Sequence, residues 1–78
     1  MRTISESTAI ANCVNFIGKN VEPTLRRVLY FSADHLSREL GSPQDFGEYL
    51  IAFSDRTGQI RHFVVRDDTG EVSEMEEL

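Results

Sequence analysis

A small set of basic and aromatic side chains gives this 78-residue chain its best candidate for a binding site. Guanidinium groups bind carboxylates and phosphates through paired hydrogen bonds, and a phenol or an imidazole can add a polar contact. The candidate residues are Arg26, Arg27, Tyr30, Arg61 and His62, with Arg66 on the same later segment. If both segments lie in one sheet, an anion or a peptide could bind across a shared face. The competing interpretation is that the arginines pair across strands with Glu48, Glu71 or Glu74.

One tripeptide invites comparison with a catalytic motif. Asp68-Thr69-Gly70 matches the active-site tripeptide of aspartic proteases, in which two such loops meet and their carboxylates share a proton. Here Glu71 follows where those enzymes have a small residue, and the later apolar-apolar-Gly segment that supports the loop is missing. We therefore interpret the tripeptide as part of a turn.

The residues that could bind a metal or transfer a proton are scattered. Cys13, His35 and His62 lack zinc-site spacing, and the carboxylates near the turns do not match an EF-hand loop. Neither histidine stands beside a recognisable nucleophile motif. The sequence therefore predicts no enzyme, no metal site and no cofactor.

Composition narrows the choice of partners and compartment. A net charge of −5 with a single lysine argues against a generic nucleic-acid binder, because phosphate affinity comes from clustered cations. No apolar stretch approaches the ~20 residues of a membrane span.

The start of the chain bears on its compartment. No apolar signal-peptide core follows Met1. If Met1 is the natural first residue, a cytoplasmic protein is expected; if the chain is a trimmed domain, an extracytoplasmic protein is expected. One cysteine cannot form an intramolecular disulfide, so a domain this small is expected to gain stability from a partner or a second copy.

The first element that must position these residues is a helix over about residues 5–18. Hydroxyl groups at its start can cap it, and a glycine can end it. Its apolar residues at helical spacing are Ile10, Cys13, Val14 and Ile17. Because Cys13 lies on this stripe, we expect a buried apolar thiol rather than a reactive one.

A strand is expected next, over residues 25–31. Simple alternation places Arg26 and Tyr30 on one face, and Leu25 and Arg27 on the other. An arginine on an apolar face fits an edge strand, where its charge can reach water.

A short helix over residues 33–40 follows, with Ser32 as its cap and Gly41 closing it. The alternative is a strand that continues toward Leu36.

The last thirty residues contain two nearly identical turns. Asp55-Arg56-Thr57-Gly58 and Asp67-Asp68-Thr69-Gly70 each separate two extended segments, so they predict a three-stranded antiparallel meander. The strands are expected near 48–54, 60–66 and 71–75, and residues 74–78 are expected to form a frayed acidic tail. The whole chain, 1–78, is therefore predicted to be one α+β domain with a helix packed on an antiparallel sheet of about four strands.

This order of elements resembles that of the PepSY-like and cystatin-like small domains. The matching segments are Ala-Ile-Ala at 9–11, the apolar run at 49–53, and the hairpin at 63–72 with its Thr-Gly-Glu-Val sequence. The resemblance covers about half of the chain. It implies a non-catalytic binding or inhibitory module with an N-terminal helix across an antiparallel sheet.

The sequence therefore favours a small non-enzymatic protein-interaction module, inhibitory or regulatory, that binds a protein partner or forms a homodimer. Exposed strand edges in such a domain can pair with a partner strand. The alternative is a small-ligand or anion-binding domain that uses a concave sheet face with Arg27, Arg61 and His62.

Overall fold

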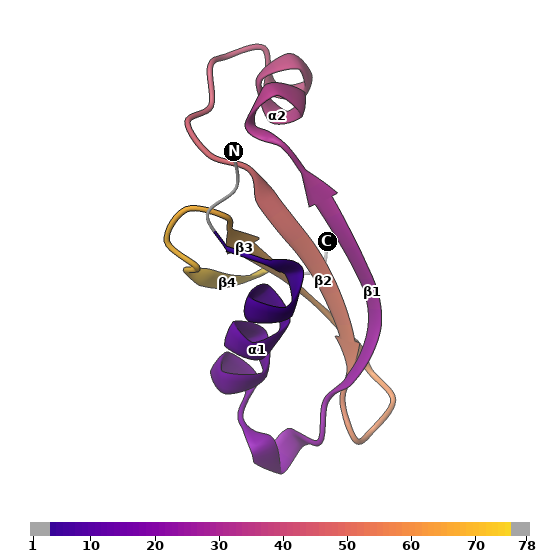
Figure 1. Ribbon diagram of the computed structural model, residues 1–78. Helices are drawn as coiled ribbons and strands as arrows, with labels where there is room; N and C mark the ends of the chain where they lie inside the picture. The colour runs from indigo at the N-terminus through magenta and orange to yellow at the C-terminus, as the bar shows by residue number, and fades with distance from the viewer. Residues whose placement is uncertain (1–3, 76–78) are drawn as a thin grey trace.

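The computed structural model describes residues 4–75, which form one antiparallel sheet with a helix across one face (Figure 1). The strand order is β1-β2-β3-β4, so each strand pairs with its neighbours in the sequence. The helical elements are α1 (Glu6–Ile17), the 3-10 turn η1 (Lys19–Val21) and α2 (Ala33–Leu40). The strands are β1 (Thr24–Phe31), β2 (Glu48–Ser54), β3 (Ile60–Arg66) and β4 (Val72–Met75). The predicted α+β fold is confirmed.

Local sequence explains where α1 begins and ends. The Ser5 hydroxyl accepts a hydrogen bond from the backbone N–H of Thr8 at 3.2 Å, and Gly18 ends the helix at φ +95°. These two caps set the length of the helix.

The core lies between α1 and the sheet. Ala9 and Cys13 are fully buried on the face of α1 that meets the sheet. Their partners in the core are Tyr49, Ile51, Phe53, Phe63 and Val65. Burial raises the pKa of the Cys13 thiol to about 11, as expected for a thiol removed from water.

The second helix forms as the sequence favoured, and the alternative of a continued strand is wrong. The Ser32 hydroxyl accepts from the backbone N–H of His35 at 3.1 Å, and Gly41 closes the helix in the left-handed conformation at φ +70°. No residue of α2 is buried. Helix α2 lies beyond the ends of β1 and β2, so it does not cover either face of the sheet (Figure 1).

A β-bulge in β1 decides which residues share a face. Leu25 lies opposite Phe53 but Arg27 lies opposite Ala52, so Arg26 is an extra residue in the ladder. The expectation that Leu25 and Arg27 share a face is therefore wrong. Leu25 lies on the side of α1, and Arg27 lies on the other side.

The end of the chain is more ordered than a frayed acidic tail from residue 74 would be. Strand β4 continues to Met75, Glu74 lies opposite Phe63, and Met75 lies opposite His62. The expected tail therefore does not begin at residue 74, and its remaining residues, 76–78, lie outside the described residues.

Candidate functional site

The structure does not bring the five predicted binding residues together. Tyr30 and Arg61 lie on the face that α1 covers, which we call the inner face. Arg27 and His62 lie on the opposite, outer face, on either side of Ala52. Arg26 occupies the bulge at the β1 edge.

Tyr30 is engaged in holding the fold together. Its hydroxyl donates to Oδ2 of Asp67 at 2.7 Å, and its ring packs against that of Tyr49 with centroids 4.9 Å apart. Oδ1 of Asp67 accepts from the backbone N–H of Gly47 at 2.9 Å, and Asp67 is only 4 % exposed. Sequence reasoning missed this buried carboxylate, because Asp67 stands where an ordinary turn aspartate is expected.

Arg61 forms a cross-strand ion pair. Its Nε and one terminal nitrogen donate to the two carboxylate oxygens of Glu74 at 2.8 and 2.7 Å, and its guanidinium lies 5.4 Å from the Phe63 ring centroid. The hydrogen bond from Arg61 lowers the pKa of Glu74 and raises the pKa of Arg61 itself. The interpretation that Arg61 pairs across strands with an acidic residue is therefore confirmed, and that residue is Glu74.

Arg66 lies at one end of the outer face. It donates two hydrogen bonds to Asp68, at 3.0 and 2.8 Å, and its guanidinium stacks on the Phe46 ring 3.7 Å from the centroid. The hydrogen bond with Asp68 raises the pKa of Arg66, and the charges of Asp68, Glu71 and Glu48 add to the effect. Glu48 lies directly opposite Arg66 on β2.

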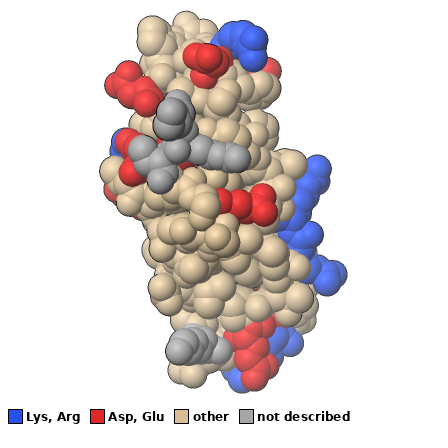
Figure 2. All heavy atoms as spheres, viewed as in Figure 1, with Lys and Arg blue, Asp and Glu red and all other residues tan. Residues whose placement is uncertain are grey.

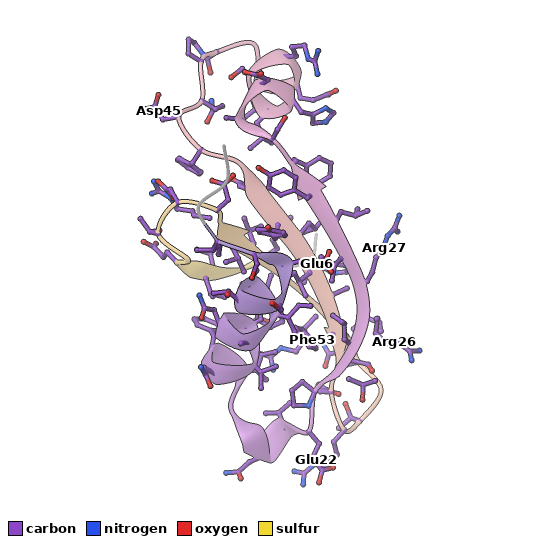
Figure 3. The ribbon with its side chains drawn as sticks, viewed as in Figure 1. Glu6, Glu22, Arg26, Arg27, Asp45 and Phe53 are labelled. Atoms are coloured by element: carbon purple, nitrogen blue, oxygen red, sulfur yellow. The ribbon has the colours of Figure 1, made fainter. Side chains whose placement is uncertain are left out.

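The β1 edge carries a positive charge. Arg26 and Arg27 are exposed, and Figure 3 shows their side chains pointing away from the sheet along this edge. The same edge of the molecule is lined by blue atoms in Figure 2. A β-bulge and charged residues on an edge strand discourage unwanted strand pairing, so these arginines have a structural explanation without any ligand.

The outer face is the side of the sheet opposite α1. Its side chains form three rows across the sheet. The first row is Arg27, Ala52, His62 and Met75; the second is Leu29, Leu50, Val64 and Ser73; the third is Phe31, Glu48 and Arg66. None of these residues belongs to the core cluster that packs with α1.

The middle row makes the outer face apolar at its centre. Leu29, Leu50 and Val64 are half-buried by their neighbours within the sheet. In an antiparallel sheet with one solvated face, the residues on that face are usually polar. Three neighbouring aliphatic side chains on the outer face depart from that pattern. The sequence held this signal: β2 and β3 have apolar residues on both faces, and α1 can cover only one of them.

A shallow hollow of about 270 Å³ lies between the start of α2, the loop before β2 and the second turn. Its polar lining residues are Tyr30, Ser32, Asp34, Asp45, Asp67 and Asp68. Among residues 4–75, no group of His, Cys, Asp or Glu is placed to hold a metal ion. Its four aspartates make the hollow an acidic recess, and it adjoins the Tyr30–Asp67 contact.

No helix within the described part of the chain is both long and apolar enough to cross a membrane. The chain matches no protein-family model, no curated protein and no solved structure. The resemblance to PepSY-like and cystatin-like domains therefore stays a prediction.

Proposed function

We propose that this chain is a non-enzymatic protein-interaction module, regulatory or inhibitory in role, and that it binds through the outer face of its sheet. The observation that carries the proposal is the uncovered row of Leu29, Leu50 and Val64 at the centre of that face. These side chains are half-buried, and a contiguous apolar surface that no helix covers and that polar residues surround is typical of an interaction site.

The rim of the outer face has the composition expected of such a site. Arg27 and His62 lie on one side of the apolar row, and Glu48 and Arg66 lie on the other. An apolar centre with a polar, charged rim is the usual anatomy of a protein–protein interface.

The alternative of an anion-binding sheet face has less support. Arg61 lies on the inner face and already binds the Glu74 carboxylate through two hydrogen bonds. Of the three residues expected to form the site, only Arg27 and His62 share the outer face, in a row with the small apolar Ala52 between them.

Site-specific photo-crosslinking in the native host tests the proposed function. A photo-reactive phenylalanine analogue replaces Leu50 at the centre of the outer face, and the matched control replaces Asn15, which is exposed on α1. We expect a protein adduct of defined mass from position 50 and none from position 15. The proposal fails if position 50 gives no adduct with any protein, including the chain itself, or if both positions give the same adduct.

A further inference from the structure

We infer that the partner at the outer face is a second copy of this chain, bound face to face about a two-fold axis parallel to the strands. This inference rests on the proposed function, and it goes further by naming the occupant and the pairing of residues. It follows from the arrangement of charge and size within the three rows of the outer face.

The two-fold axis is set by the strand order. Strands β2 and β3 are the two central strands, so an axis midway between them lays β2 of one copy over β3 of the other. Rotation about an axis parallel to the strands keeps each residue at its own level along the sheet. Each row of the outer face therefore meets the same row of the second copy.

Charge complementarity follows at one end of the interface. Glu48 of each copy faces Arg66 of the other, and both residues already lie opposite each other within one sheet. Arg66 uses two of its five N–H donors on Asp68, so three are left for the glutamate of the second copy. The dimer would place two glutamates and two arginines in alternation. Packed sheets lie about 10 Å apart, a gap that long Glu and Arg side chains can span.

The other rows are complementary in size and polarity. Leu50 of one copy faces Val64 of the other in the middle row, which removes aliphatic surface from water. In the first row the large His62 ring faces the small Ala52 side chain. Large residues opposite small ones let the two faces interdigitate.

Charge argues against the other face-to-face symmetry. A two-fold axis perpendicular to the strands reverses the order of the rows, so Arg66 would lie over His62 and Phe31 would lie over Arg27. Glu48 would then face Ala52 and lose its cationic partner across the interface. The parallel axis keeps each Glu48 against an Arg66, so charge complementarity favours it.

The size of the outer face predicts a reversible dimer. Four strands spaced about 4.8 Å apart and about five residues long make a patch of roughly 19 by 17 Å. Such a patch covers roughly 320 Å² on each copy and about 650 Å² in the pair, well below the ~1,200 Å² of stable complexes. We therefore expect a weak, reversible dimer that forms only at high protein concentration.

Complementary charge variants test the pairing. In the dimer, Glu48→Arg alone places two arginines against each other at both Glu48–Arg66 contacts. Arg66→Glu alone places two glutamates against each other at the same contacts. We expect each variant alone to dimerise at least about tenfold more weakly than the native chain in sedimentation equilibrium. An equal mixture of the two variants restores opposite charges at both contacts, so we expect a heterodimer of near-native affinity.

Two further variants keep the test decisive. Leu50→Lys places a charge at the centre of the outer face and should abolish dimerisation, whereas Arg26→Glu, at the β1 edge, should leave it unchanged. Circular dichroism and thermal melting check that each variant is folded. The inference is overturned if the native chain stays monomeric at high micromolar concentration, if Leu50→Lys still dimerises, or if the mixed variants do not associate.

The failure of this inference can be told apart from failure of the proposed function. A monomeric native chain whose position 50 crosslinks to a different protein retains the interaction function but excludes the second copy. A monomeric chain that gives no adduct at position 50 excludes both.

Discussion

The two turns of the meander have almost the same sequence but bind their first aspartate differently. Oδ1 of Asp55 accepts from backbone N–H groups of its own turn, those of Thr57 at 2.9 Å and Gln59 at 3.1 Å. The Asp67 carboxylate instead leaves its turn and accepts from Gly47 and Tyr30. The first aspartate side chain thus bonds within its own turn, which is joined to η1 through the Arg56 N–H and the Val21 main-chain oxygen at 3.1 Å. The second aspartate side chain joins its turn to β1 and to the loop before β2.

The backbone closes the two turns at different residues. The Gly58 N–H donates to the main-chain oxygen of Asp55 at 2.9 Å, whereas the Gly70 N–H donates to that of Arg66 at 3.0 Å. The second turn has Asp68 where the first has Arg56, and the Asp68 carboxylate accepts from the Thr69 backbone N–H at 2.7 Å. The Asp67 side chain binds Gly47 and Tyr30, and its main-chain oxygen accepts from the N–H of Ile4 at 3.0 Å. A turn motif predicts where the chain reverses, but its neighbours decide which groups its side chains bind.

The largest expected difference between the turns is at their first residue. Asp67→Ala removes the acceptor of the buried Gly47 N–H and an acceptor of the Tyr30 hydroxyl, so we expect a loss of about 2–5 kcal/mol in the free energy of unfolding. Urea denaturation followed by circular dichroism measures it. Asp55→Ala is the matched control, and equal shifts in midpoint for the two variants would contradict the comparison.

The next effect concerns the glycine that receives Asp67. A Cβ at Gly47 would lie 2.5 Å from Oδ2 of Asp67 and 2.6 Å from the main-chain oxygen of Phe31, which cannot move alone. We expect Gly47→Ala to cost about 1–3 kcal/mol through this clash. In the first turn a Cβ at Gly58 would meet nothing within 4 Å, so Gly58→Ala should cost only the ~1 kcal/mol of its positive φ. Thermal melting of both variants would refute this if Gly58→Ala were the less stable.

A double-mutant cycle tests the contact between the second turn and α1. The Asn12 side-chain amide donates to the Gly70 main-chain oxygen at 3.1 Å, and a Cβ at Gly70 would come within 2.7 Å of the same nitrogen. We expect Asn12→Ala to cost about 1 kcal/mol, and Gly70→Ala to cost less in that background than in the native chain. Asn15→Ala, on an exposed part of α1, is the control. Strict additivity of Asn12→Ala and Gly70→Ala would show that the two positions are not in contact.

The smallest effect is the pH dependence of the first turn. Hydrogen bonds from Thr57, its hydroxyl first, lower the pKa of Asp55 below its usual value, so the folded state favours the carboxylate. This stabilisation is present above the unfolded pKa of about 3.9 and is lost as the pH falls through the lower folded value. We expect Asp55→Ala to show a slightly shallower fall in urea midpoint between neutral pH and pH ~3 than the native chain. A steeper fall would contradict the assignment.

Signals that act over a few residues predicted most of the fold. Ser5 and Ser32 cap their helices, and both Asp-x-Thr-Gly segments reverse the chain between strands. These features depend on hydrogen bonds between residues close in sequence, which is why composition and spacing revealed them.

The candidate site could not be assembled in the same way. The bulge at Arg26 exists only in relation to β2, and it moved Arg27 to the face opposite Leu25. The contact of Tyr30 with Asp67 joins residues 37 positions apart. Single-sequence alternation contains neither relation, so it placed residues on a shared face that the sheet separates.

The single buried thiol gives this domain a built-in labelling probe. Cys13 is fully buried on the face of α1 that packs on the sheet, and with a pKa of about 11 only about one thiol in 10⁴ is ionised at pH 7. A thiol reagent can therefore react at an appreciable rate only after the helix separates from the sheet. The labelling rate at Cys13, compared with that of an unfolded control, would report the free energy of that opening in the native chain without any introduced dye or mutation.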